Sequence, residues 1–134
     1  MTATGNSTFN TSTGKGVALP PELELGPYRI IRKLGQGGFG ITYLACHLET
    51  QQQVVIKENM PTFYAYRDDN TLRIHPLDEQ ENIDNYNHTL TRFVEEARTL
   101  ARLEHPNIVR VREAFEALGT AYYVMPYVGG KELH

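Results

Sequence analysis

The feature that most constrains the fold is a glycine-rich segment, LGQGGFGITYLA, which lies between two stretches of strand-like sequence. Apolar and polar side chains alternate over residues 28–34, and ITYLACH after the glycines is rich in residues that favour strands. Four glycines fall within six residues: Gly35, Gly37, Gly38 and Gly40. They therefore join two antiparallel strands, and they either let the backbone approach a ligand closely or simply form a flexible hairpin.

Three further stretches predict strands, and one predicts a helix. The segment VVIKE is short, apolar and β-branched, IVRVREAFEA alternates, and AYYVMPYV is an apolar run that follows a turn at LGT. In TRFVEEARTLARLEHPN, Phe93, Ala97, Leu100 and Leu103 recur at helical spacing, and Pro106 prevents continuation. The order β-β-β-α-β-β predicts an α+β fold, a five-stranded antiparallel sheet with one main helix.

Two segments are expected to lie outside this core. Residues 1–25 begin with many Thr, Ser, Gly and Asn residues and are expected to form a flexible amino-terminal tail, so that residues 26–134 make up the folded domain. Residues 59–90 are polar and without a clear period, which favours an insertion or lid over core.

Composition narrows the class of protein. The 134 residues suffice for one modest domain, and a formal net charge of -3 argues against a nucleic-acid partner. No apolar window is long enough for a transmembrane helix, so no membrane partner is expected. A single cysteine, Cys46, excludes an internal disulfide and fits a reducing cytoplasm. None of the five histidines has the spacing of metal ligands, so no metal site is expected.

The glycine pattern has two nucleotide-binding meanings, and its context separates them. A dinucleotide-binding turn joins a strand to a helix and is followed about 20 residues later by an acidic residue at a strand end. Here a second strand follows the glycines, and VVIKE occupies the later position. The context favours a glycine-rich hairpin whose backbone N–H groups cover phosphates, with an ordinary flexible hairpin as the alternative.

Two charged residues sharpen the hypothesis. Lys57 follows three apolar residues in its strand, and Glu96 lies three residues after Phe93, beside the apolar side of the predicted helix. A buried cation and a buried anion each need a partner, so we expect Lys57 and Glu96 to pair and Lys57 to contact ligand phosphates. Two unrelated, half-exposed charges are the alternative.

Taken in order, these segments resemble the amino-terminal lobe of protein kinases. LGQGGFGITYLA is similar to the glycine-rich loop, and VVIK is similar to the V-A-I-K strand. EEARTLARLEHPNIV is similar to the αC helix and its following turn, and YYVMPYVGGKEL to the last strand and hinge. The match spans residues 28–134. GGFGITYLA and IKENMP are most similar to bacterial Ser/Thr kinases of the eukaryotic type.

The resemblance implies a role for each matching residue. Lys57 would hold the α- and β-phosphates of ATP as a catalytic residue, with Glu96 as its partner on the αC helix. Met125 would be the gatekeeper behind the adenine, and Thr42 and Val55, where Val and Ala are commoner, would form its roof. The hinge, residues 126–132, would bind the adenine edge and ribose. The implied nucleotide-binding set is Gly35, Gln36, Gly37, Gly38, Phe39, Gly40, Thr42, Val55, Lys57, Met125, Pro126, Val128 and Glu132.

The same resemblance limits the expected activity. The 134 residues contain no H-R-D-x-x-x-x-N and no D-F-G, the segments that supply the catalytic base and the Mg²⁺ ligands in kinases. We therefore expect a kinase amino-terminal lobe without its carboxy-terminal lobe. It would bind ATP but not transfer phosphate to a protein substrate by itself. A pseudokinase-like binding or interaction module is the alternative. An exposed inter-lobe surface around Val55, Leu100 and Met125 would favour a homodimer.

Overall fold

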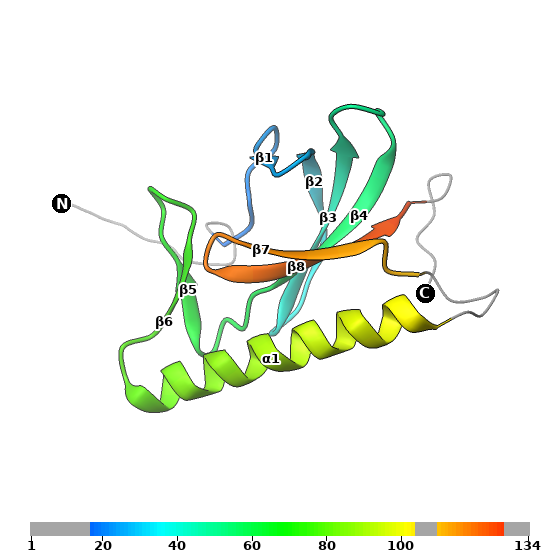
Figure 1. Cartoon of the computed structure of the whole chain (residues 1–134). Helices are drawn as coiled ribbons and strands as arrows, with labels where there is room; N and C mark the ends of the chain where they lie inside the picture. The colour runs from blue at the N-terminus through cyan, green and yellow to red at the C-terminus, as the bar shows by residue number, and fades with distance from the viewer. Residues whose placement is uncertain (1–16, 104–109, 128–134) are drawn as a thin grey trace.

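The computed structural model describes residues 17–103 and 110–127, which form one curved antiparallel sheet with a long helix beneath it (Figure 1). The strands lie in the order β1-β2-β3-β4-β8-β7, and β5 and β6 form a separate two-stranded sheet. The elements are β1 (Glu24–Leu25), β2 (Tyr28–Gln36), β3 (Gly40–His47), β4 (Gln53–Asn59), β5 (Ala65–Arg67), β6 (Ile74–Pro76), α1 (Gln80–Arg102), β7 (Glu113–Ala117) and β8 (Thr120–Pro126).

The predicted α+β fold is confirmed, with small differences at its amino-terminal side. The five expected strands are β2, β3, β4, β7 and β8, and the two-residue strand β1 extends their sheet by pairing with β2. The expected tail is too long, because Leu19 and Leu25 are buried in the main core. The main chain N–H of Leu19 also donates to the hydroxyl of Tyr43, which fixes this segment on the sheet.

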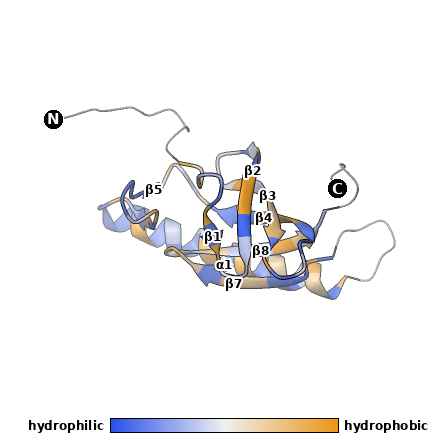
Figure 2. Cartoon of the chain, turned by 90° about the horizontal axis from the view of Figure 1, so that it is seen from above, coloured by the Kyte–Doolittle hydropathy of each residue, from blue (hydrophilic) through white to orange (hydrophobic). Residues whose placement is uncertain are grey.

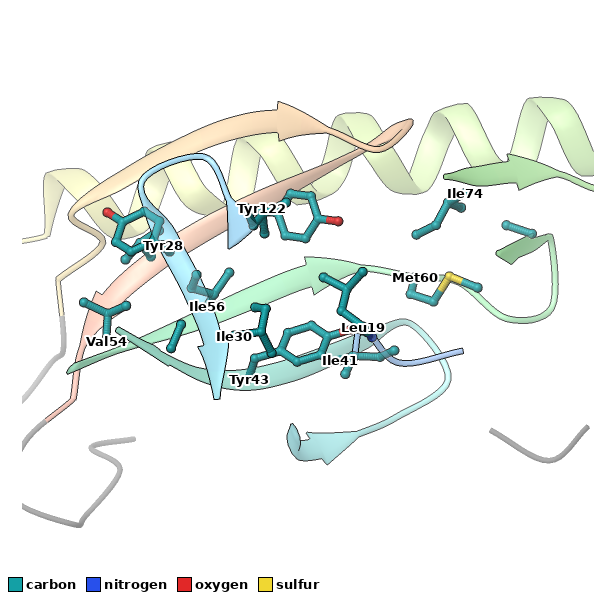
Figure 3. Packing of buried hydrophobic residues seen from close by; sticks show 14 of the residues in the cluster. Leu19, Tyr28, Ile30, Ile41, Tyr43, Val54, Ile56, Met60, Ile74 and Tyr122 are labelled. Atoms are coloured by element: carbon teal, nitrogen blue, oxygen red, sulfur yellow. Dashed lines mark hydrogen bonds between the residues drawn. The ribbon is translucent and has the colours of Figure 1, made fainter. Parts of the chain in front are cut away.

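The expectation for residues 59–90 is wrong in one respect, since this segment contributes to the core. It contains the β5–β6 hairpin and the first eleven residues of α1, and Met60, Ala65, Ile74 and Tyr86 are buried with the sheet residues. Figure 3 shows Met60 and Ile74 in the same packed cluster as the central strands. The segment looked polar because its buried apolar residues are widely spaced, with exposed residues such as Phe63 and Tyr66 between them.

Helix α1 starts earlier than the sequence prediction. Ile83, Tyr86 and Leu90 precede Phe93 at i, i+3 and i+7, which continues the spacing of the predicted apolar stripe toward the amino terminus. The helix accordingly presents both hydrophobic and hydrophilic residues along its length (Figure 2). Its second half packs in a small cluster made of Phe93, Ala97, Leu100, Ala101, Val111, Tyr123 and Met125. Leu103, expected in the stripe, is instead exposed just after the helix end.

Strand β4 separates two environments because successive side chains point to opposite faces of a sheet. Lys57 faces one side, whereas Glu58 faces the other and is fully buried. The carboxylate of Glu58 accepts hydrogen bonds from the hydroxyl of Tyr43 at 2.7 Å and of Tyr122 at 2.6 Å. It also forms an ion pair with Arg67 of β5, with Nη2 and Oε1 2.6 Å apart. This network fastens the β5–β6 hairpin to the centre of the sheet.

The network predicts a loss of stability at alkaline pH. Burial, and then the charge of Glu58, raise the pKa of the Tyr43 and Tyr122 hydroxyls above their ordinary value of 10.0. Above about pH 10 the unfolded chain ionises these tyrosines while the folded chain keeps them neutral, so the free energy of unfolding falls by up to about 1.4 kcal/mol per pH unit for each. Below about pH 10 both tyrosines are neutral in the folded and the unfolded chain, so their contribution to the free energy of unfolding is fully present. Urea denaturation followed by circular dichroism between about pH 8 and about pH 11 measures the slope, and a flat profile would contradict the prediction.

Candidate functional site

The register of the sheet places predicted site residues in a row across four strands. Gly35 of β2 lies opposite Thr42 of β3, Thr42 opposite Lys57 of β4, and Lys57 opposite Tyr123 of β8. Residues directly opposite one another in antiparallel strands share a face of the sheet. A parallel row follows two residues away and is made of Leu44, Val55 and Met125. Five residues of the predicted set, Gly35, Thr42, Val55, Lys57 and Met125, therefore share one face.

A pocket of about 810 Å³ lies between this face and α1. From the predicted set it is lined by Phe39, Gly40, Thr42, Lys57 and Glu96. Gly35, Gln36, Gly37, Gly38, Val55, Met125 and Pro126 are described by the structure but do not line it. Val128 and Glu132 lie outside the described residues. The pocket thus corresponds to the end of the predicted site that would hold phosphates, and the predicted adenine end lies beside it.

Sequence reasoning missed the contribution of the first half of α1 to this pocket. Asn85, His88 and Arg92 line it opposite the glycine-rich loop, and they belong to or follow the segment read as an insertion. The Arg92 side chain carries a positive charge, which suits a pocket for an anionic group. The helical spacing of Ile83, Tyr86 and Leu90 would have located this part of the helix.

The expected ion pair between Lys57 and Glu96 is not formed. Among residues 17–103 and 110–127 the ion pairs are Arg67 with Glu58 and Arg29 with Glu22. Glu96 is exposed and not on the buried side of the helix, because the residues that pack on the sheet are its neighbours in the stripe, Phe93, Ala97 and Leu100. Lys57 is half-buried at the opposite side of the same pocket.

Tyr123 interacts with both members of the expected pair. The Lys57 ammonium lies 6.0 Å from the centroid of the Tyr123 ring, within the range of a cation–π contact. Burial, the negative charge of Glu96 and a hydrogen bond to Glu96 raise the pKa of the Tyr123 hydroxyl above its ordinary value. Since Tyr123 is itself buried against α1, its ring connects the two charged groups in place of a direct ion pair.

The glycines differ in what they require. A Cβ on Gly40 would lie 2.9 Å from the main-chain oxygen of Glu58, so the close approach of β3 to β4 needs glycine there. A Cβ on Gly35 or Gly37 would meet no protein atom within 4 Å. Their small size is therefore not demanded by packing within the described chain, and it leaves room for a ligand near the backbone.

One buried polar group beside the pocket has no hydrogen-bond partner within the described part of the chain. Asn59 follows Lys57 by two residues on the same face and is 2 % exposed, and its Nδ2 atom is unpaired. Its main-chain oxygen accepts a hydrogen bond from Thr120 Oγ1 at 2.7 Å. A buried donor without a partner costs about 1–3 kcal/mol, and such costs concentrate at functional sites.

The described residues contain no cluster of three His, Cys, Asp or Glu side chains that could hold a metal ion. The structure also contains no helix, over the ranges that it describes, with the length and apolar character needed to cross a membrane.

Comparison with known proteins identifies the family of the chain. The family model of the protein kinase domain matches residues 28–134. Serine/threonine-protein kinase PknD of Protochlamydia amoebophila is 33% identical over 129 residues, which cover 96% of this chain and 10% of that protein. CBL-interacting protein kinase 12 of Oryza sativa subsp. japonica is 36% identical over 81% of this chain and 16% of that protein. The chain therefore spans a small part of these relatives.

Solved structures show the same arrangement. The apo form of PpkA-294 has a TM-score of 0.77 and 34% sequence identity, over 83% of this chain and 39% of that one. The Mycobacterium tuberculosis PknI kinase domain has a TM-score of 0.52 and 25% identity, over 83% of this chain and 37% of that one. The sheet, the helix and the glycine-rich hairpin together correspond to the amino-terminal lobe, and the chain belongs to the protein kinase domain family.

Proposed function

We propose that this chain is the ATP-binding amino-terminal lobe of a Ser/Thr protein kinase, which in the complete enzyme transfers the γ-phosphate of ATP to a protein substrate. The observation that carries the proposal is the row of Gly35, Thr42 and Lys57 beside a pocket that Phe39 and Gly40, at the end of the glycine-rich loop, help to line. Three similar proteins are named as serine/threonine-protein kinases, which favours Ser/Thr acceptors, although another is the tyrosine-protein kinase MasK of Myxococcus xanthus.

Lys57 and the glycine-rich loop together fit a nucleotide phosphate chain. Lys57 supplies a positive charge that no carboxylate neutralises within the described chain, and the space beside Gly35 and Gly37 admits a ligand close to the backbone. A charge-assisted hydrogen bond from an ammonium to phosphate is among the stronger interactions available in such a site. Val55 and Met125 lie opposite each other on the same face of the sheet as Lys57, and their apolar side chains suit the flat surface of adenine.

The remaining assignments extend the site along the chain. Pro126 is the last residue of β8 and lies opposite Val54. Its carbonyl and the Val128 amide would bind the adenine edge, and Glu132 would bind the ribose. Mg²⁺ would accompany ATP in a complete kinase. We infer that the 134 residues by themselves bind ATP without turnover, because the base and metal-binding motifs are not among them.

A binding experiment tests the proposal directly. Titration of the 134-residue chain with Mg-ATP, followed by isothermal calorimetry, should give saturable binding, and Lys57→Met should weaken it about ten- to a hundredfold because a charged hydrogen bond to phosphate is lost. Lys33→Met is the matched control: Lys33 is an exposed lysine of β2 that contacts Gln36 at 3.0 Å and does not line the pocket. Adenosine binding should be the same in all three proteins.

Two outcomes separate the alternatives. Equal ATP binding by the wild type and Lys57→Met would contradict the assignment of Lys57. No binding of ATP or adenosine to the wild type would favour an interaction module over a nucleotide-binding lobe.

The proposed function does not include a homodimer. Of the residues expected to form its surface, Val55 is buried and Leu100 and Met125 are half-buried. This side therefore presents less apolar surface than the sequence suggested, and self-association stays a prediction without structural support.

A further inference from the structure

The tip of the glycine-rich loop is bound to the chain segment that follows β4. The main-chain N–H of Met60 donates to the carbonyl of Phe39 at 3.0 Å, and that of Thr62 donates to the carbonyl of Gly38 at 3.1 Å. The side chain of Phe63 also lies beside the tip, since a Cβ added to Gly38 would be 3.5 Å from its ring. These contacts continue the pairing of Gly40 with Asn59 beyond the end of the sheet.

The segment has one anchored end and one exposed end. Met60 and Pro61 are buried in the core, whereas Thr62 and Phe63 are exposed, Phe63 to 71 %. A turn closed by the hydrogen bond from the Tyr64 N–H to the Pro61 carbonyl, 2.9 Å, holds the two exposed residues in place. Core packing therefore explains Met60 and Pro61 but not the contacts that Thr62 and Phe63 make with the loop tip.

The hydrogen bonds fix the orientation of two peptide groups. In a trans peptide the N–H points away from the C=O, and the described chain has no cis peptide bonds. With the Gly38 carbonyl directed at Thr62, the N–H of Phe39 points away from that segment. Phe39 donates no main-chain hydrogen bond within the described residues, so its N–H group is available to an anion.

We propose that residues 60–63 form a tether that positions the glycine-rich loop for phosphate binding, with the Thr62 N–H as its most exposed connection. The proposal rests on the proposed ATP-binding function and identifies a positioning element that the glycine pattern alone does not reveal. The tether holds the glycine-rich loop in place before the nucleotide binds, which reduces the entropy cost of ordering the loop. Because the loop contacts the phosphates, the tether should affect the affinity for ligands that carry phosphates.

The test uses a substitution that the local turn tolerates. Thr62 occupies the second position of the Pro61–Tyr64 turn, where proline is favoured, so Thr62→Pro removes the N–H donor and keeps the turn. We expect Thr62→Pro to weaken Mg-ATP binding about five- to tenfold, because it removes both the N–H and the hydroxyl that donate to the Gly38 carbonyl, with adenosine binding unchanged. The control Thr62→Ala keeps the N–H and removes only the longer hydrogen bond from Thr62 Oγ1 to the Gly38 carbonyl, 3.4 Å, so it should change ATP affinity less than about twofold.

Hydrogen exchange measured by NMR tests the tether without any nucleotide. The amide of Thr62 in the wild-type chain should exchange slowly although its side chain is exposed, and exchange at the rate of an unstructured amide would overturn the tether. Equal ATP affinity in Thr62→Pro and the wild type, or an equal loss for adenosine, would overturn its role in phosphate binding. A wild-type chain that binds no ATP contradicts the proposed function, and the exchange rate of Thr62 then still decides whether the tether exists.

Discussion

Replacing Glu58 by alanine is expected to lower the free energy of unfolding by about 3–5 kcal/mol, because it leaves a buried guanidinium without its partner. The Arg67 side chain is 1 % exposed and that of Glu58 is inaccessible to solvent. Burial acts to lower the pKa of Arg67, but the charge of Glu58 and the hydrogen bond to it outweigh that effect and hold the pKa above its ordinary value. Two tyrosine hydroxyls lose their acceptor as well. Urea denaturation followed by circular dichroism measures the change.

A surface ion pair provides the matched control. Glu22 and Arg29 lie 3.6 Å apart, with Glu22 exposed and Arg29 half-buried at the surface, so Glu22→Ala should cost less than about 1 kcal/mol. The double variant Glu58→Gln/Arg67→Met should lose less stability than the sum of its two single variants, because removing both charges leaves neither one buried alone. Losses for Glu58→Ala no larger than for Glu22→Ala would show that the buried network is not a determinant of stability.

Replacing Gly119 by alanine is expected to cost about 2–4 kcal/mol, since two effects act at one position. Gly119 has φ +78°, and an added Cβ would lie 2.4 Å from the main-chain oxygen of Ile74. The β7–β8 turn also accepts hydrogen bonds from the Ile74 N–H, at Leu118, and from the Tyr86 hydroxyl, at Gly119. A shift of the turn to relieve the clash would therefore disturb β6 and α1 together.

Gly26→Ala separates the two effects. Gly26 has φ +59°, and an added Cβ would meet no atom within 4 Å, so this variant should show the backbone strain alone, about 1 kcal/mol. Thermal denaturation of the three proteins gives the comparison. If both variants lose the same stability, the contact with Ile74 is relieved at no cost and the prediction for Gly119 is wrong.

The glycine loop, the strand with Lys57 and the helix with Glu96 could be located from the sequence because each depends on local spacing. Period-two alternation and helical spacing report which face of an element is buried. The alignment of Gly35, Thr42 and Lys57 across three strands depends on the register of the sheet, which local spacing does not report. The relative position of two elements depends on packing between distant residues. Local spacing predicted that Lys57 and Glu96 lie near each other, and both line the same pocket. It did not predict that each interacts with Tyr123 and not with the other, because that depends on how the helix packs on the sheet.

The buried network around Glu58 illustrates a second limit. A carboxylate next to Lys57 suggests a solvated residue, because charged side chains are almost never fully buried without a partner. Its partner Arg67 lies in a polar segment that gave no periodic pattern, and nothing local connects the two. Only the fold shows that Arg67 returns to the sheet centre, where it also donates to the main-chain oxygen of Leu72 at 2.9 Å.

The order of the strands has a consequence for handling the protein at high concentration. The two edge strands of the six-stranded sheet are β1 and β7, and unpaired edges of a sheet can recruit strands from other molecules. Strand β1 is two residues long, and β7 carries Glu113 and Glu116, both exposed. A short edge on one side and a negatively charged edge on the other disfavour growth of the sheet between molecules. The edge of the sheet at β7 is therefore a poor site for edge-to-edge aggregation.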